Sequence, residues 1–557
     1  MKNLQKQHYI IIAIWFIANL LQSIFTGLHS DESYYWMYSQ NPAWGYFDHP
    51  PLAAALIYPG YGLIHCELGV RLLFIIISTV TLALILNELN EQKDFWFLAI
   101  FTASFPLIHT HISGFMAIPD IPLLLFTMLF LALYKKFIIN PGTGLSVLLA
   151  IIISGMIYSK YHAFLIIGLT VLSNPKLLKN KYFYLTAAIA LILMIPHIKW
   201  QIENEFPTLK YHIVERTKPF RLKYVFPNLV SQLIMAGPLT GALVFLKLSK
   251  YKIRDLFDKA LIFNILGFYI IFFLLSFKNR IEAHWTAAII PMLMIVVYRG
   301  ISDDPKIKFW FKRLALPVII LFILFRIYIA TDAIPNIGKI KITFYNRKVH
   351  AMEIKKMADG RKVGFFNNYA AISNYIFYSG EPAVHLSTPD YRYCQYDLWN
   401  DEKYAEGSSV IAVQSKHLTP PNLTRMATGE MKGFIIIDKF QSLKGLQLEI
   451  KDSKISAAKL HISVQLINNG ETPVFTDHLS EPSIGIMQDK KEIYSLPLKV
   501  MAKSGRIMQG NSIIATLEIP VEQVNLKIPA TIYIRSKENY RGNMVLLKPA
   551  DIRGQNQ

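Results

Sequence analysis

The sequence predicts a polytopic α-helical membrane protein with about eleven to thirteen transmembrane helices, followed by a soluble α/β module and a β-sandwich-like module. Two observations carry this prediction. Hydrophobic residues make up 53% of the 557 residues and the mean hydropathy is +0.32, which is too apolar for a soluble chain of this length. Apolar runs of roughly membrane-spanning length recur from residue 9 to residue 330 and then stop.

About eleven apolar runs are candidates for membrane-spanning helices. They occupy residues 9–28, 69–88, 95–110, 119–139, 144–158, 161–173, 182–197, 225–247, 259–277, 283–298 and 314–330. Several are shorter than the ~20 residues that a perpendicular helix needs, and residues 52–66 are apolar without forming a convincing span. Thirteen spans are therefore an alternative, and an odd number is expected in either case.

Basic residues in short loops set the expected orientation, because cytoplasmic loops are enriched in lysine and arginine. Such residues precede the first run and follow the fourth, sixth, eighth and tenth, among them Lys2, Lys135, Lys176, Lys247 and Arg299. We therefore expect a cytoplasmic amino terminus and an extracytoplasmic tail. A cleaved signal peptide is the alternative for the first run, but that run lacks a clear small-residue cleavage site.

The polar tail divides into two expected modules, residues 334–440 and 441–557, after a membrane domain at 1–333. A helical stretch near residues 351–359 and strand-like runs at 362–366 and 433–437 predict a small α/β module. Short alternating runs at 446–450, 459–466, 513–517 and 530–534, separated by turn residues, predict a β-sandwich of immunoglobulin-like outline. Its expected role is packing or partner binding.

Charge and cysteine content exclude several classes of protein. The chain has 58 Lys and Arg against 38 Asp and Glu, a formal net charge of +20. An expected outward location and the absence of a nucleic-acid module argue against nucleic acid as the reason for this excess, whereas a membrane surface or an acidic substrate fits. Two cysteines, Cys66 and Cys394, exclude a disulfide-rich scaffold, and whether they pair is left open.

The first outer loop carries two pairs of ionisable residues. Asp31 and Glu32 are adjacent, so on a helix they point about 100° apart and only one can address a reacting atom while the other supports it. Asp48 and His49 precede two prolines that keep the chain extended. This pair could bind a divalent cation or hold a sugar hydroxyl or phosphate. A solvated acidic loop with an aromatic belt is the alternative for Asp31 and Glu32.

Two further residues lie at the ends of apolar runs. Asp120 follows Pro119 at an expected helix start, where it could be a plain cap or a functional carboxylate. Lys160 separates two apolar runs near the outer edge of the membrane, where an ammonium needs an anionic partner or must snorkel to the interface. His109 and His111 face apart at i,i+2 spacing, so no role is assigned to them.

Positive charge in a later outer loop departs from the inside-positive trend. The loop spans about residues 197–224 and includes Lys210, His212 and Arg216. Together with Lys160, Arg280 and His284, these residues could form a phosphate-binding pocket at the lipid interface.

The order of these motifs resembles that of a known family. Asp-Glu in the first loop, Gly-Tyr-Phe-Asp-His-Pro-Pro, Ile-Pro-Asp before an apolar helix, Tyr-Ser-Lys and Glu-Ala-His-Trp are similar to motifs of bacterial GT-C glycosyltransferases. The resemblance is to the family 39 group, related to protein O-mannosyltransferases and the lipid A aminoarabinose transferase, and covers about residues 1–330. It implies a polytopic GT-C fold in the bacterial inner membrane with an outward active site.

The resemblance also implies roles for individual residues. Asp31 would act as the base or orient the acceptor, with Glu32 in support, and Asp48 would bind substrate or a divalent cation. His49 stands where the aminoarabinose transferases often have lysine. Asp120 would match the family's Pro-Asp carboxylate and Lys160 its donor-phosphate lysine. The histidine that some relatives carry in the later loop is not clearly matched, since His212 is only nearby.

The resemblance implies a polyprenyl-phosphate sugar as donor. Together with the charged residues above, it leads us to expect inverting transfer of a sugar from this donor to lipid A, another envelope glycan or a protein. A transporter or flippase of an anionic polyprenyl-linked lipid is the alternative, although the sequence shows no paired halves or inverted repeats. A scaffold whose tail binds envelope partners is a third reading, and the placement of Lys160 argues against it.

Overall fold

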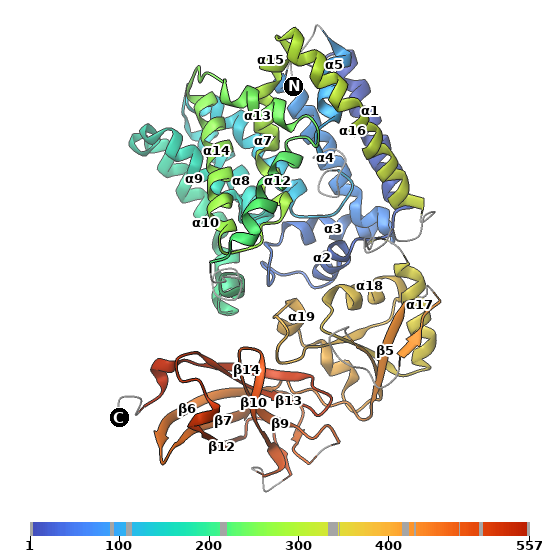
Figure 1. Ribbon diagram of the computed structural model, residues 1–557, viewed down its shortest axis with the longest axis vertical. Coiled ribbons are helices and arrows are strands. Elements are labelled where there is room, and N and C mark those ends of the chain that lie inside the picture. The colour runs from blue at the N-terminus through green and yellow to red at the C-terminus, as the bar shows by residue number, and fades with distance from the viewer. Residues whose placement is uncertain are drawn as a thin grey trace. The chain divides into compact units, whose positions relative to one another are not determined.

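The computed structural model describes residues 4–89, 94–106, 114–211, 220–331, 344, 346–414, 423–427, 430–477, 479–500 and 505–553. The chain forms two compact units, Met1–Tyr345 and Asn346–Gln557 (Figure 1). The expected boundaries after residues 333 and 440 stay predictions. His109, His111, His212 and Arg216 lie outside the described residues.

The first unit is helical. Its helices are α1 (Lys6–Phe25), α2 (Ser30–Gln40), α3 (Leu52–Leu63), α4 (Glu67–Leu89), α5 (Phe95–Ala103), α7 (Asp120–Phe137), α8 (Thr143–Ser159), α9 (Ala163–Ser173), α10 (Lys181–Glu203), α11 (Pro207–Leu209), α12 (Val225–Met235), α13 (Gly241–Ser249), α14 (Leu256–Ser276), α15 (Ile290–Ser302) and α16 (Pro305–Thr331). Most of them match the apolar runs, so the hydropathy pattern predicted the helical part well.

Six segments among the described residues are long and apolar enough to cross a membrane: α1, α4, α10, α14, α16 and the segment Ala283–Ser302. Three shorter apolar helices, α3, α8 and α9, do not reach that length. The count of eleven to thirteen spans stays a prediction. One expected run, 225–247, is wrong as a single helix. It breaks between α12 and α13, where Gly237 has a φ of +135° and Pro238 follows.

Burial separates outer helices from central ones. In α10 and α16 only 22% of the most apolar window is buried, whereas in Ala283–Ser302 the share is 72%. Apolar residues of α10 and α16 are therefore left for lipid, and the segment before and within α15 lies inside the bundle. The α1 and α16 helices run beside each other (Figure 1), and Arg326 of α16 donates to Gln22 and Asn19 of α1 at 3.1 and 2.6 Å.

The loops with the expected cytoplasmic position meet at one end of the bundle. Glu88 near the end of α4 pairs with Lys135 near the end of α7 at 3.3 Å, and Lys247 of α13 pairs with Asp304 before α16 at 2.8 Å. A cavity of about 590 Å³ at this end is lined by residues of both pairs and by Arg254 and Arg299. Basic residues that follow the fourth, eighth and tenth apolar runs therefore lie at one end of the bundle. Which membrane face they meet stays a prediction.

The second unit begins with a mixed α/β sheet. Its strands, β1 (Lys362–Phe366), β2 (Ala383–Leu386), β3 (Val410–Gln414), β4 (Leu423–Arg425) and β5 (Met431–Ile437), have the order β2-β1-β3-β5-β4. β1 runs parallel to β2 and β3, and β5 runs antiparallel to β3 and β4. The helices are α17 (Arg347–Ala358), α18 (Tyr369–Ser379) and α19 (Gln395–Leu398). The expected α/β pattern is present.

The rest of the unit forms two facing antiparallel sheets. One contains β9 (Ser483–Gln488), β10 (Lys491–Pro497), β13 (Ala530–Arg535) and β14 (Arg541–Leu547), and the other contains β6 (Leu446–Ser456), β7 (Lys459–Asn468) and β12 (Ser512–Pro520). A small ribbon joins β8 (Val474–Phe475) and β11 (Arg506–Ile507).

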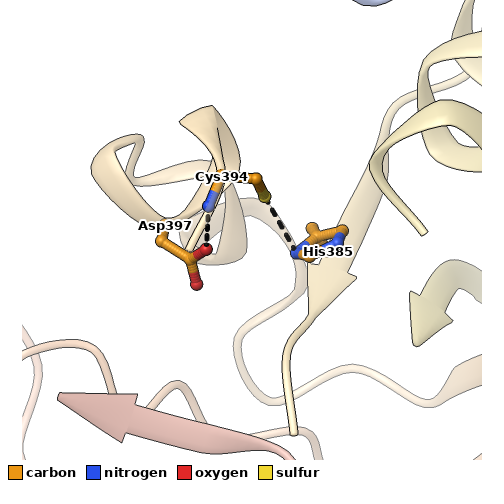
Figure 2. A group of neighbouring side chains, drawn as sticks. All are labelled: His385, Cys394 and Asp397. Carbon is orange, nitrogen blue, oxygen red and sulfur yellow. Dashed lines mark hydrogen bonds between the residues drawn. The ribbon is translucent and has the colours of Figure 1, made fainter. Parts of the chain in front are cut away.

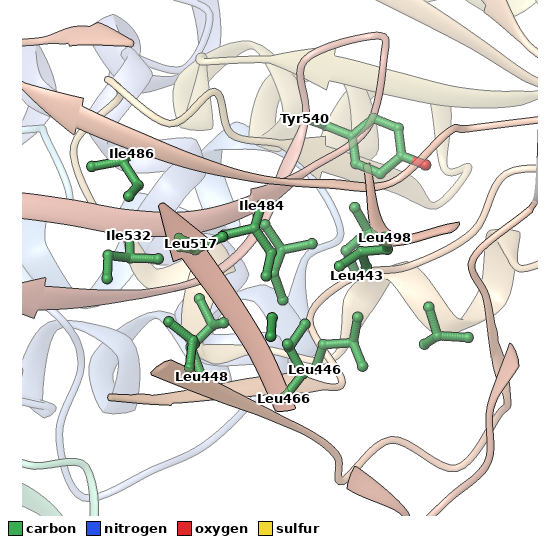
Figure 3. Close-up of a cluster of buried hydrophobic side chains, with 14 of the residues drawn as sticks. Leu443, Leu446, Leu448, Leu466, Ile484, Ile486, Leu498, Leu517, Ile532 and Tyr540 are labelled. Carbon is green, nitrogen blue, oxygen red and sulfur yellow. The ribbon is translucent and has the colours of Figure 1, made fainter. Parts of the chain in front are cut away.

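Alternate residues of the two sheets form a shared core. In β7 every second side chain is buried, including Ile462 and Val464, because strand residues point alternately to opposite faces. Figure 3 shows Leu448, Leu466 and Leu517 of one sheet beside Ile484, Ile486 and Ile532 of the other. This core continues into the α/β sheet through residues such as Val384 and Val410, so the two modules form one compact unit.

Candidate active site

Glu32 fixes the start of α2. Its carboxylate accepts two hydrogen bonds from Arg71 of α4, at 2.7 and 2.6 Å, and one each from the backbone N–H groups of Ala117 and His29, at 2.9 and 2.8 Å. Both side chains of the pair are fully buried. Burial alone would raise the pKa of Glu32, but the charge and hydrogen bonds of Arg71 bring it below its usual range.

Arg71 extends this junction to the end of α1. Its guanidinium also donates to the carbonyl oxygens of Thr26, Gly27 and Ser23, at 2.6, 2.7 and 3.3 Å. One ion pair therefore ties together four segments: the end of α1, the start of α2, α4 and the segment before α7. Sequence reasoning missed Arg71, although an arginine inside an apolar run is itself a signal that a partner exists.

Asp31 points away from this buried junction. Its side chain is 44% exposed and its carboxylate lies 3.7 Å from Nδ1 of His29. Its charge also acts on His49 of the next loop. The one-residue step along α2 thus places Glu32 in the interior and Asp31 beside the Asp48–His49 loop, as a rotation of about 100° requires.

The Asp48–His49 loop is held by aromatic residues of α2. Tyr38 donates to Oδ1 of Asp48 at 2.6 Å and stacks on Tyr46, with ring centroids 4.1 Å apart. The His49 ring meets Tyr35 edge to face, with centroids 5.2 Å apart. Burial lowers the pKa of His49, so the imidazole is neutral near pH 7.

The same loop is clamped from the other side by α10. A Cβ atom on Gly45 would lie 2.4 Å from the Trp200 ring, so only glycine fits there. Nδ1 of His197 is 2.6 Å from the carbonyl oxygen of Trp44, which makes Nδ1 the donor, and Nε2 then accepts from the Tyr161 hydroxyl at 3.0 Å. Sequence reasoning missed these contacts, because the partners are far apart in the chain.

Asp120 and Lys160 form a second buried ion pair. The Nζ atom of Lys160, at the end of α8, donates to both carboxylate oxygens of Asp120, the first residue of α7, at 2.7 and 2.9 Å. Their side chains are 9% and 7% exposed. Asp120 is thus the anionic partner that the sequence led us to expect for Lys160 as the alternative to snorkelling.

Charged groups from distant segments converge on this pair. The charges of Asp48, Lys160, Asp120 and Asp31 all act on His49. The charge of His284, in the 3₁₀ segment Ala283–Ile289, acts on Asp120 together with that of His162, a residue that sequence reasoning missed. The structure therefore brings together six of the expected site residues: Asp31, Asp48, His49, Asp120, Lys160 and His284.

The remaining expected residues are held elsewhere or lie outside the described chain. Lys210 pairs with Glu205 in its own loop at 2.7 Å, and Arg280 pairs with Glu282 at 3.3 Å, and all four side chains have access to solvent. For His212 and Arg216 the structure gives no position. The roles of all the expected site residues stay predictions.

An apolar cavity of about 430 Å³ lies among α7, α8, α9 and α10. Tyr161 and His197, which hold the Trp44 loop, line it together with apolar side chains such as Phe130, Ile157 and Phe164. Because Tyr161 and His197 belong to both, the cavity borders the site, and its apolar lining suits a hydrocarbon chain.

Comparisons with known proteins agree with this architecture. Residues 48–200 match the family model described as dolichyl-phosphate-mannose-protein mannosyltransferase. The crystal structure of ArnT from Cupriavidus metallidurans in the apo state superposes with a TM-score of 0.54 and 13% identity, covering 77% of this chain and 97% of that chain. The same ArnT bound to undecaprenyl phosphate gives a TM-score of 0.56 and 14% identity with the same coverage.

The chain has the GT-C fold. The expected resemblance is thereby confirmed for the fold, including the soluble carboxyl-terminal part. No curated protein sequence matches the chain. At this level of identity, the GT-C likeness establishes architecture, while the substrates must be argued from the site.

Proposed function

We propose that the chain is an inverting glycosyltransferase that moves a sugar from a polyprenyl-phosphate donor to an acceptor at the outer face of the bacterial inner membrane. The acceptor class is lipid A, another envelope glycan or a protein hydroxyl. One observation carries the proposal: Asp31, Asp48, His49, Asp120 and Lys160, from separate segments, converge at one end of the bundle. The GT-C fold and the ArnT crystallised with undecaprenyl phosphate support this donor class.

Lys160 would stabilise the leaving group. When the C1–O bond of the donor breaks, the polyprenyl phosphate gains charge, and a preorganised ammonium in a buried site stabilises that charge more than water does. Asp120 holds Nζ in place through two hydrogen bonds, so little reorganisation is needed. The ammonium has a third N–H that can donate to the phosphate.

Asp31 would serve as the general base. Its side chain is partly exposed, so an acceptor hydroxyl can reach it, whereas Glu32 is enclosed by its donors. Asp31 takes the acceptor proton while the acceptor oxygen bonds to the anomeric carbon and the phosphate leaves on the opposite side. One displacement of this kind inverts the configuration. Neutral His49 can orient a sugar hydroxyl beside it.

The donor's isoprenoid chain would lie in the apolar cavity among α7 to α10. Its lining is almost entirely hydrocarbon, and its polar end is marked by Tyr161 and His197. The sequence also predicted a divalent cation at Asp48. Among the described residues, no third ligand-type side chain joins Asp48 and His49, so the protein alone does not build that site, and no step depends on it.

Asp31→Asn tests the proposal. The full chain, purified in detergent, is given polyprenyl-phosphate sugars and candidate acceptors, and product is measured by mass spectrometry. The wild type should transfer sugar, and Asp31→Asn should lose turnover by about 100-fold or more with an unchanged melting temperature. Asp303→Asn, which alters an exposed carboxylate at the end of α15, is the matched control. Near-normal turnover in Asp31→Asn would remove that residue from its role.

The same assay separates the enzyme from a flippase. A transporter needs a sealed compartment, whereas transfer proceeds in detergent. If the wild type makes no product with any donor but moves anionic polyprenyl lipids across proteoliposomes, the transferase proposal fails.

A further inference from the structure

Three ligand-type side chains meet in the α/β module, outside the site described above. His385 is in β2, Cys394 precedes α19, and Asp397 lies in the first turn of that helix (Figure 2). One ligand atom from each lies within 4.8 Å of the other two. His385 and Cys394 are each 1% exposed. The cluster is therefore an interior feature and not a surface accumulation of polar groups.

The three side chains are ligand types that zinc-class metals use together. A metal would bind a ring nitrogen of His385, the thiolate of Cys394 and a carboxylate oxygen of Asp397, and these atoms are already within 4.8 Å of one another. Binding would displace the thiol proton.

Nδ1 is the ring nitrogen of His385 that faces the cluster (Figure 2). It lies 3.9 Å from Sγ of Cys394 and 3.2 Å from the Ser387 hydroxyl. The two ring nitrogens lie on opposite sides of the imidazole, so a metal bound at Nδ1 leaves the proton of the neutral ring on Nε2.

Hydrogen bonds from Ser387, Arg541 and the Cys394 backbone orient the Asp397 carboxylate. Its Oδ1 accepts from Ser387 Oγ at 3.0 Å and Arg541 at 3.1 Å, and its Oδ2 accepts from the Cys394 N–H at 2.8 Å. Metal-binding carboxylates are commonly oriented by such hydrogen bonds. Each carboxylate oxygen has more than one lone pair, so Oδ2 keeps one for a cation.

Distance and ligand type together select the metal class. In a tetrahedral zinc site the sulfur and nitrogen ligands are about 3.6 Å apart, close to the observed 3.9 Å. Arg541 and Lys444 lie nearby, but Asp397 pairs with the first and Asp401 and Glu402 pair with the second. A thiolate and an imidazole favour zinc-class ions over hard ions such as Mg²⁺.

We propose that His385, Cys394 and Asp397 bind one zinc-class divalent ion that fastens α19 to β2. On binding, the thiol proton passes to solvent, and bonds form from Sγ, the imidazole and the carboxylate, with water or the Ser387 hydroxyl in the fourth position. Arg541 starts β14 and its N–H donates to the Ser387 carbonyl at 2.8 Å, so the ion would also stabilise the seam between the α/β sheet and the sandwich.

Cobalt titration tests this proposal on the full chain, purified in detergent with a histidine-free tag and stripped with a chelator. One Co²⁺ per chain should produce a thiolate-to-cobalt charge-transfer band, which Zn²⁺ should displace. The band should vanish in Cys394→Ser and persist in Cys66→Ser, since these are the two cysteines of the chain. His385→Gln should weaken cobalt binding by at least about 10-fold.

Two results would overturn it. One is a wild-type chain that shows no cobalt–thiolate band at millimolar Co²⁺. The other is a band that survives in Cys394→Ser. Should Cys394→Ser misfold, the wild type still decides: Zn²⁺ must raise the melting temperature of the stripped protein, and an unchanged melting temperature contradicts a structural ion. Metal at Asp48 cannot imitate the band, because no cysteine belongs to that loop.

Discussion

Two buried ion pairs in the described part of the bundle differ in how completely they are enclosed. Glu32 accepts hydrogen bonds from Arg71 and from two backbone N–H groups, and Arg71 also donates to three carbonyl oxygens. Asp120, among the described residues, accepts hydrogen bonds from Lys160 alone. Protein groups satisfy the hydrogen-bonding capacity of the first pair, whereas the second pair can still form hydrogen bonds with a ligand.

Their surroundings differ in the same direction. Around Asp120 and Lys160 lie the ionisable residues His49, His162 and His284. Around Glu32 and Arg71 the neighbours are mainly backbone groups and the Phe115 ring, which is 5.2 Å from the guanidinium carbon. Both pairs are buried, but their surroundings indicate different roles. We infer that the first pair holds the fold together and the second handles substrate charge.

The largest effect is expected from breaking the first pair. Arg71→Met leaves the Glu32 carboxylate fully buried without its counter-charge, which costs about 3–5 kcal/mol of stability. The variant should insert poorly or melt at a much lower temperature, measured by thermal unfolding in detergent. Glu32→Gln/Arg71→Met should recover only part of this loss, because the carbonyls of Thr26 and Gly27 still lack their donor.

A smaller stability effect is expected at the second pair. Lys160→Met leaves Asp120 without its counter-charge, which costs about 3 kcal/mol, the lower end of the range for a broken buried pair, because 9% of the Asp120 side chain stays exposed. Adding Asp120→Asn should restore most of that loss, since it removes the uncompensated charge and the pair makes no other hydrogen bond among the described residues. Comparison of the two melting temperatures checks this. Failure of Asp120→Asn to rescue Lys160→Met would mean that this pair, too, is a fixed structural element.

The pH dependence sharpens the comparison further. Burial lowers the pKa of His49 in the folded chain, so between that value and the unfolded value near 6.5 the unfolded chain binds more protons. Stability should therefore fall as pH drops below about 6.5, by at most about 1.4 kcal/mol per pH unit for this group. Asp48, Lys160, Asp120 and Asp31 all act on it.

His49→Gln should flatten the profile between about pH 6.5 and pH 5, measured as melting temperature against pH. An unchanged profile would show that other groups dominate acid destabilisation. Glu32 should contribute nothing in this window, because its pKa is below the ordinary range.

The smallest effects are expected at the exposed pairs. Lys210→Ala and Arg280→Ala should each change stability by less than about 1 kcal/mol, because exposed ion pairs contribute little. If these residues attract the donor phosphate, KM for the donor should rise several-fold while kcat stays unchanged. An unchanged KM would place both outside the donor site.

Local sequence patterns predicted many of the helices and strands, but they did not predict which distant residues pair. The strand Lys362–Phe366 was predicted from its strand-like run of residues, and β7 and β12 from the alternation of apolar and polar residues. β9 was missed because both of its faces are largely buried and its residues do not alternate. Glu32 and Arg71 are 39 residues apart and Trp44 and His197 are 153 apart, and a single sequence carries no signal that joins such positions.

The most direct test compares turnover in the two double variants at a temperature where both are folded. Asp120→Asn/Lys160→Met should keep a near-normal melting temperature and lose sugar transfer by about 100-fold or more. Glu32→Gln/Arg71→Met should show the reverse, with most of the turnover kept per folded molecule. Near-normal transfer by Asp120→Asn/Lys160→Met would contradict the account, because the phosphate charge would then be stabilised elsewhere.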